Sequence, residues 1–223
     1  MANRPDNPVA KSGVIKLFPT YVWVAQLKPE VYEPINARIE SYLQELERRN
    51  PELSASGQWQ TTQDLHHQPA LDGLVSLVEA NARSICDSLT LVYEGLQITG
   101  CWANVSQQGF PHRQHIHPNN YLSGAYYVKT APGADSISFH DPRPQATMLV
   151  PPARNQDLAN PDQVSLDVSD GTLVMFPAWL HHSVAPNRSS ITRISVAFNL
   201  MFPEFGTKMA SPLWRGDTGS SQP

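Results

Sequence analysis

Hydrophobic positions in the N-terminal half of the chain recur at every third or fourth residue. This spacing holds in two segments, residues 30–49 and 72–92, and it places the apolar side chains on one face of an amphipathic helix. We therefore predict two helices, each packed through one face against a core. The segment between them, "SGQWQTTQDLHHQPA", has no such period and is expected to form a loop. The apolar series are Val31, Ile35, Ile39, Leu43 and Leu46, then Leu71, Leu74, Val78, Ala82, Ile85 and Leu89.

From about residue 96 the pattern changes to short runs that are alternating or continuously apolar, separated by turn-forming residues. Such runs are typical of β-strands. A series of short strands after two helices predicts a barrel or two-sheet sandwich with the helices packed outside. An earlier β-rich segment, "VIKLFPTYVWV", is interrupted by Pro19 and predicts two short strands or one kinked edge strand. The later runs are "LQITGCWANVS", "YLSGAYYVK", "SISFHDP", "ATMLVP", "QVSLDV", "GTLVMFPAWL", "HHSVAP" and "TRISVAFNLMF".

No internal repeat or low-complexity linker divides the chain, so we expect one domain over residues 14–206. Residues 1–13 and 207–223 are polar and contain proline, glycine and serine, and we expect both ends to be flexible.

Composition narrows the possible functions. Of the 223 residues, 40% are hydrophobic and 16% charged, as in ordinary globular proteins, and the net charge of −4 argues against general nucleic-acid binding. The two cysteines, Cys86 and Cys101, form no CxxC motif, which excludes a cysteine-rich zinc module. The N-terminus lacks the apolar core of a signal peptide, and no apolar run is long enough to span a membrane. We therefore expect a cytoplasmic protein, with a homodimer as a generic expectation.

Three histidines lie within six residues in "HRQHIH", residues 112–117. If this segment is a strand, His115 and His117 point to the same face and can bind one metal ion, whereas His112 has the opposite parity. By itself the pattern is weak, because solvated histidines before a strand are common. It leaves two alternatives, a metal site and a polar loop.

A second group of polar residues follows about sixty-five positions later. His181 and His182 come after an apolar run, and Arg193 is the one basic residue in the apolar "TRISVAFN". A buried arginine needs an anionic partner, and Ser195 shares its face of the strand. Arg193 and Ser195 could together bind one carboxylate, and the alternative is a structural salt bridge to Asp or Glu elsewhere.

Taken together, these segments resemble the non-haem iron(II), 2-oxoglutarate-dependent oxygenases, and more narrowly the 2OG-Fe(II) oxygenase family found in bacteria and phages. The resemblance spans roughly Val14 to Phe205. It implies a mainly β fold with flanking helices, namely a double-stranded β-helix of the jelly-roll or cupin-like type. The segments that carry it are "HRQHIHPNNYLSGAYYV", "FHDPRP", "GTLVMFPAWLHHSVAPNRS", "TRISVAFN", "WQTTQDLH" and "LFPTYVW".

The resemblance also implies roles for individual residues and two cofactors, Fe(II) and 2-oxoglutarate. His115, His117 and His182 would be the metal ligands. Arg193 and Ser195 would hold the distal carboxylate of 2-oxoglutarate. Further cosubstrate contacts would come from Tyr127 and Asn104, with Asn199 as another candidate, and no catalytic residue is implied beyond the ligands.

One residue departs from the usual pattern of these oxygenases. Their metal site has two histidines and one carboxylate, and here His117 occupies the carboxylate position. Asp141, in "HDPRP", is an alternative source of a carboxylate ligand.

The resemblance implies hydroxylation of a small-molecule or peptide substrate with O2. Two other functions remain open. One is a three-histidine metal dioxygenase that does not use 2-oxoglutarate, with Arg193 binding a carboxylate of the substrate. The other is a non-catalytic protein that binds a metal or a small acid.

Overall fold

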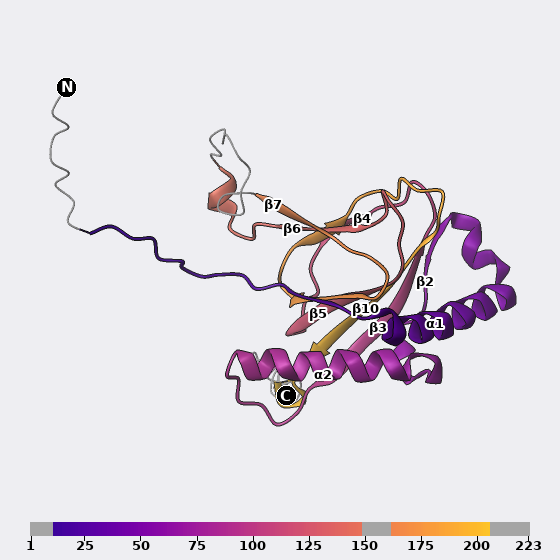
Figure 1. Cartoon of the computed structure of the whole chain (residues 1–223), viewed down its shortest axis with the longest axis horizontal. Helices are drawn as coiled ribbons and strands as arrows, with labels where there is room; N and C mark the ends of the chain where they lie inside the picture. Colours follow the sequence, from indigo (N-terminus) through magenta and orange to yellow (C-terminus); the bar gives the residue numbers. More distant parts are fainter. Residues whose placement is uncertain (1–10, 149–161, 206–223) are drawn as a thin grey trace, which may run out of the picture.

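The strands of the computed structural model form two antiparallel sheets that face each other (Figure 1). The structure describes residues 11–148 and 162–205, so the termini that we predict to be flexible lie almost entirely outside it. The larger sheet has six strands in the order β1-β8-β5-β10-β3-β2, and the smaller has four in the order β4-β9-β6-β7.

The elements have the following bounds. The strands are β1 (Trp23–Gln26), β2 (Gln58–Gln60), β3 (Gln97–Ser106), β4 (His112–His115), β5 (Leu122–Lys129), β6 (Ser136–His140), β7 (Gln163–Asp167), β8 (Thr172–Pro177), β9 (His182–Val184) and β10 (Arg193–Met201). The helices are α1 (Pro29–Arg49) and α2 (Asp72–Ser88), with short 3₁₀ turns at Pro51–Ser56, Leu65–His67, Pro69–Leu71 and Pro144–Thr147.

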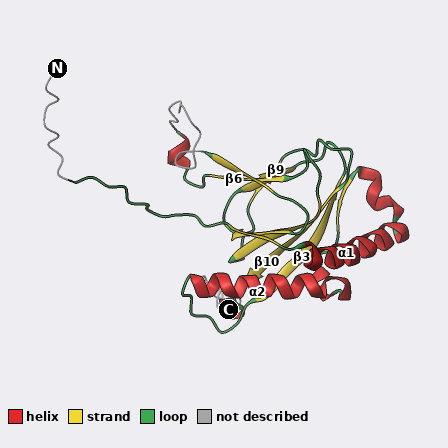
Figure 2. Cartoon of the chain, viewed as in Figure 1, coloured by secondary structure: helices red, strands yellow, loops and turns green. Residues whose placement is uncertain are grey.

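From β3 onward the chain crosses repeatedly between the two sheets. The strands β3, β5, β8 and β10 belong to the larger sheet, and β4, β6, β7 and β9 to the smaller one. This topology is a double-stranded β-helix, which confirms the predicted fold class. Both helices lie on the outer side of the larger sheet, opposite the smaller sheet (Figure 2).

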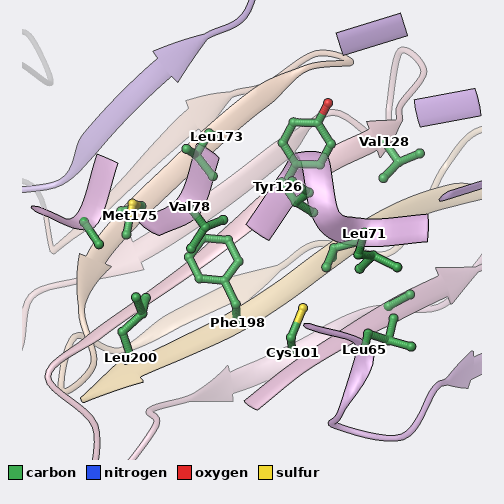
Figure 3. Close-up of a cluster of buried hydrophobic side chains, with 14 of the residues drawn as sticks. Leu65, Leu71, Val78, Cys101, Tyr126, Val128, Leu173, Met175, Phe198 and Leu200 are labelled. Atoms are coloured by element: carbon green, nitrogen blue, oxygen red, sulfur yellow. The ribbon is translucent and has the colours of Figure 1, made fainter. Parts of the chain in front are cut away.

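The larger sheet is buried on both faces, and alternate residues of each strand serve the two faces. Side chains of β10 on the helix-facing side, such as Phe198, pack with Val78 of α2 in the main core (Figure 3). On β5, Tyr126 belongs to this core, whereas the next residue, Tyr127, belongs to a second cluster between the sheets. Because both faces of the central strands are mostly buried, these strands appear in the sequence as nearly continuous hydrophobic runs.

A buried polar pair fixes α1 on the sheet. The Asn36 amide nitrogen donates to the Val128 carbonyl at 2.7 Å, and the Tyr126 hydroxyl donates to the Asn36 amide oxygen, also at 2.7 Å. Both side chains are almost fully buried, so each polar atom is paired where water cannot reach it.

Several element boundaries differ from those predicted. The helix expected over 72–92 ends at Ser88, because Thr90 adopts a left-handed conformation, φ 53°, that an α-helix cannot continue. The early β-rich segment contributes only β1, and Val14 and Phe18 before it are exposed.

Two further differences concern strand assignments. The predicted inter-helical loop contains β2, which pairs with β3 through Trp59 and Val105. The stretch has no hydrophobic period that would predict a strand, but its Trp59 is buried and packs in the core. The predicted strand "ATMLVP" begins in a 3₁₀ turn, and its last residues lie outside the described ranges. Within those ranges, neither helix combines the length and the apolar character that crossing a lipid bilayer requires.

We expect Gly124→Ala to destabilise the sheet, because a Cβ atom there would lie 2.6 Å from both Phe198 Cε2 and the Val174 carbonyl oxygen. Overpacking of this kind costs about 1–3 kcal/mol of unfolding free energy. Gly100→Ala is the matched control in the same sheet, since its nearest contact would be an ordinary 3.6 Å to Trp102. Urea denaturation of both variants measures the difference, and equal stabilities would contradict the packing described here.

Candidate functional site

A small cavity lies between the two sheets. The space open to the centre of a water molecule is about 70 Å³, which is large enough for a few waters or a small ligand. The larger sheet contributes its inward-facing residues and the smaller sheet contributes histidines and apolar side chains. The lining residues from the larger sheet include Trp102, Asn104, Tyr127, Arg193 and Ser195. Those from the smaller sheet and its adjoining turn include His112, His115, His117, Ile137 and His182.

Three histidines meet at this cavity. A ring nitrogen from each of His115, His117 and His182 lies within 4.8 Å of the other two. His115 ends β4 and His182 begins β9, and the two are directly paired in the smaller sheet. The sequence prediction that these three residues lie together is thus met by the geometry, and their role as metal ligands stays a prediction.

The position of His117 differs from the one the strand parity predicted. The strand β4 ends at His115, and His117 lies in the turn that follows, where its backbone N–H donates to the Ala178 carbonyl at 2.9 Å. His117 therefore joins the cluster from beyond the end of the strand.

Hydrogen bonds orient two of the three rings. His115 Nδ1 lies 2.7 Å from the Arg113 carbonyl oxygen, and His182 Nδ1 lies 2.9 Å from the Leu180 carbonyl oxygen. A carbonyl only accepts, so in the neutral rings Nδ1 carries the proton and Nε2 keeps its lone pair. This is the arrangement by which histidine ligands are commonly aimed at a metal.

Burial keeps two histidines of this cluster, His117 and His182, neutral. It lowers the pKa of His117 to about 4, with a further contribution from His115. Burial likewise lowers the pKa of His182 to about 3, although the bond to the Leu180 carbonyl opposes the shift. At neutral pH both rings are therefore in the unprotonated form that binds metal ions.

Arg193 is a buried cation in the same cavity. Its side chain is 4% exposed, and its one hydrogen bond within the described part of the chain is a long one, 3.5 Å from Nη1 to the Ala185 carbonyl. No carboxylate pairs with it within residues 11–148 and 162–205. Burial lowers the pKa of Arg193, while the nearby Tyr127 opposes the shift. Among the described residues, Arg193 therefore has no acidic partner for the structural salt bridge that was the alternative interpretation.

The other predicted cosubstrate contacts differ in their surroundings. Tyr127 and Ser195 are paired on adjacent strands and both line the cavity. Burial raises the pKa of the Tyr127 phenol well above its usual range, so it remains a hydrogen-bond donor. Asn104 also lines the cavity, but its amide oxygen already accepts from Gln60 Nε2 at 2.7 Å.

Two further candidates lie elsewhere. Asn199 is not part of the cavity lining, and its amide oxygen accepts from the Ser123 hydroxyl at 2.7 Å. Asp141 is paired with Arg143 at 2.7 Å and does not join the histidine cluster. The group of potential metal ligands found among the described residues consists of histidines alone.

The parity argument wrongly placed His112 away from the site. A bulge in the β4–β9 pairing, between His112 and His115, changes the parity, and His112 lines the cavity. Its Nε2 is buried without a hydrogen-bond partner among the described residues. Burial, with the nearby Arg193 charge, lowers its pKa to about 4. The apolar and polar pattern of "HRQHIH" gives no signal of a bulge.

Comparison with known proteins gives related folds at low sequence identity. The chain is similar to the crystal structure of AviO1 from Streptomyces viridochromogenes Tue57, with 16% identity, 82% of this chain and 90% of that chain covered, and a TM-score of 0.57. It is also similar to a Pseudomonas putida prolyl-4-hydroxylase, with 16% identity, coverage of 82% and 93%, and a TM-score of 0.53.

A third similar structure is HygX from Streptomyces hygroscopicus with nickel and 2-oxoglutarate bound, at 13% identity, coverage of 82% and 83%, and a TM-score of 0.51. Identities this low establish the fold alone. No curated protein sequence matches the chain.

A comparison of the sequence with protein-family models finds one similar family. Residues 100–199 match the family described as "Putative 2OG-Fe(II) oxygenase". The matched range runs from β3 to β10 and contains the three histidines and Arg193. The part of the chain that forms the site is therefore similar to the 2OG-Fe(II) oxygenase family in sequence, and most of the chain is similar in fold to the solved structures above.

Proposed function

We propose that the protein is an Fe(II)- and 2-oxoglutarate-dependent dioxygenase that hydroxylates a small-molecule or peptide substrate. One observation carries the proposal: Arg193, a buried cation without an acidic partner among the described residues, lines the same cavity as the three-histidine cluster. A buried charge is costly without a counter-ion, so the site is built for an anion beside a metal.

The residues present fit a metal ion. His115, His117 and His182 offer three neutral nitrogen donors within 4.8 Å of one another. Imidazole ligands suit iron, and three ligands leave positions open on an octahedral ion. Because none of the three is a carboxylate, a divalent ion here would keep its full positive charge, which favours binding of an anionic chelator.

The residues present also fit a dicarboxylic 2-oxo acid. Arg193 and Ser195 are two residues apart on β10 and line one wall of the cavity. Tyr127, directly opposite Ser195 on β5, adds a phenol to the same wall. A guanidinium binds a carboxylate through two parallel hydrogen bonds, and hydroxyl donors complete its shell.

When bound, iron and 2-oxoglutarate would supply the oxidation, in which O2 and 2-oxoglutarate are converted to succinate and CO2 and one oxygen atom enters a substrate C–H bond. The protein's own residues orient the cosubstrate and limit water. Apolar side chains such as Ile137, Phe176 and Val184 line part of the cavity, and they strengthen the electrostatic interactions made there.

A spectroscopic titration tests cosubstrate binding. Fe(II) is added to metal-free protein under argon, followed by 2-oxoglutarate, and the visible spectrum is recorded. We expect a weak charge-transfer band that requires both additions. Arg193→Ala should weaken 2-oxoglutarate binding by about 30-fold, since a hydrogen bond to a charged group contributes about 1.5–3 kcal/mol. His182→Ala should abolish the band.

Products and oxygen uptake separate the proposal from its alternatives. Succinate formation that depends on 2-oxoglutarate supports it. Oxygen uptake without a need for 2-oxoglutarate would indicate a three-histidine dioxygenase instead. Tightly bound zinc with no oxygen uptake and no band would indicate a non-catalytic binding protein.

His117→Ala tests the third ligand directly. The variant should bind Fe(II) or Zn(II) more than about 100-fold more weakly, because losing even an outer partner of a metal ligand costs about 10–100-fold. Competition with a chromophoric chelator measures this affinity. His140→Ala is the control, since His140 bonds to Ser183 outside the cavity lining. Equal metal affinity in the two variants would remove His117 from the site.

Arg193→Met tests the cost of the unpaired cation. Methionine keeps much of the apolar stem and removes the charge, so we expect the ligand-free variant to be more stable by about 1–3 kcal/mol. Chemical denaturation gives the free energy of unfolding with and without 2-oxoglutarate. A variant less stable than the ligand-free wild type would show that Arg193 already has a sufficient partner.

A further inference from the structure

His112 has an unused hydrogen-bonding atom beside the predicted carboxylate site. Its Nε2 is buried, and among the described residues nothing pairs with it. Such atoms are rare in folded proteins because each one sacrifices hydrogen bonds to water without replacing them.

The backbone places His112 next to Arg193. In the smaller sheet His112 is directly opposite Val184. Arg193 comes from the larger sheet, and its Nη1 reaches the carbonyl of Ala185, the residue after Val184. The two side chains therefore meet at the same end of the β4–β9 pair, and both line the cavity. The Arg193 charge also contributes to the low pKa of His112, as expected for neighbouring groups.

Among the described residues, Arg193 has unused hydrogen-bond donors, and His112 has an unused acceptor. A guanidinium has five N–H donors, and Arg193 has one long contact at 3.5 Å, which is beyond the usual range for a good hydrogen bond. A neutral imidazole has one lone pair to offer. A hydrogen bond from the guanidinium to Nε2 of His112 would give this acceptor a partner. It would also fix the plane of the guanidinium, whose two parallel N–H donors must point toward a carboxylate.

We propose that His112 is a positioning residue: when the 2-oxo acid binds, Nε2 of His112 accepts a hydrogen bond from Arg193 and orients the guanidinium toward the distal carboxylate of the acid. The inference rests on the proposed function, because it assumes that Arg193 binds this carboxylate. It assigns His112 to cosubstrate recognition and not to the metal. The effect of His112 must then depend on the distal carboxylate and on Arg193.

Two ligands test the first dependence. Mn(II)-loaded protein is titrated by calorimetry under argon with 2-oxoglutarate and with 2-oxovalerate, which has the same chain length and lacks the distal carboxylate. His112→Leu should weaken 2-oxoglutarate binding about tenfold, the size of a hydrogen bond to a charged group. It should leave 2-oxovalerate affinity within about twofold. His112→Gln, which keeps an acceptor near the Nε2 position, should recover most of the loss.

Two further variants complete the test. His140→Leu is the matched control, because it removes a histidine of the same sheet that is absent from the cavity lining; it should change neither affinity. The double variant His112→Leu/Arg193→Met should bind 2-oxoglutarate no more weakly than Arg193→Met alone, since His112 acts through Arg193.

The outcomes that contradict the inference are distinct. If His112→Leu weakens both acids equally, the ring serves only packing. If the two substitutions are additive, His112 does not act through Arg193. Unchanged 2-oxoglutarate affinity in His112→Leu excludes any role in recognition. If the wild-type protein itself shows no preference for 2-oxoglutarate over 2-oxovalerate, the proposed function fails, and this is visible before any His112 variant is made.

Discussion

The central strands of the six-stranded sheet are buried on both faces, and this burial sets the positions of the helices, the smaller sheet and the cavity. One face is covered by α1 and α2, and the other faces the smaller sheet and the cavity. On β10 this alternation places Phe198 in the core and Arg193 in the cavity. The same strand thus provides packing energy on one side and chemistry on the other, so the position of the site is fixed by the core rather than by flexible loops.

The site contains groups that its fold does not satisfy. Arg193 is buried without an acidic partner and His112 Nε2 is buried without any partner, both among the described residues. Each arrangement costs folding free energy, which the apolar core offsets. Unsatisfied groups of complementary character in one cavity are what a preorganised binding site requires, because the ligand then replaces missing interactions instead of displacing existing ones.

The third histidine gives this site its own electrostatic character. With His117 at the position where the resemblance implies a carboxylate, and with Asp141 held by Arg143, the described residues bring no negative charge to the predicted metal-ligand group. Together with Arg193 this makes the cavity uniformly suited to anions. The low identity to solved structures of the same fold, 13–16%, shows that this fold persists while most of the sequence changes.

The two amphipathic helices, most of the strand series and the three histidines that the fold brings together could be predicted from the sequence, because hydrophobic period and residue chemistry are local properties. Only the tertiary structure decided which histidines face the cavity. A bulge turned His112 inward and a turn carried His117 past the end of β4, and neither feature has a local signal. The short strand β2, which contains Trp59, could not be predicted from the sequence either. Its stability comes from pairing with β3 and from burial, and not from its own hydrophobic pattern.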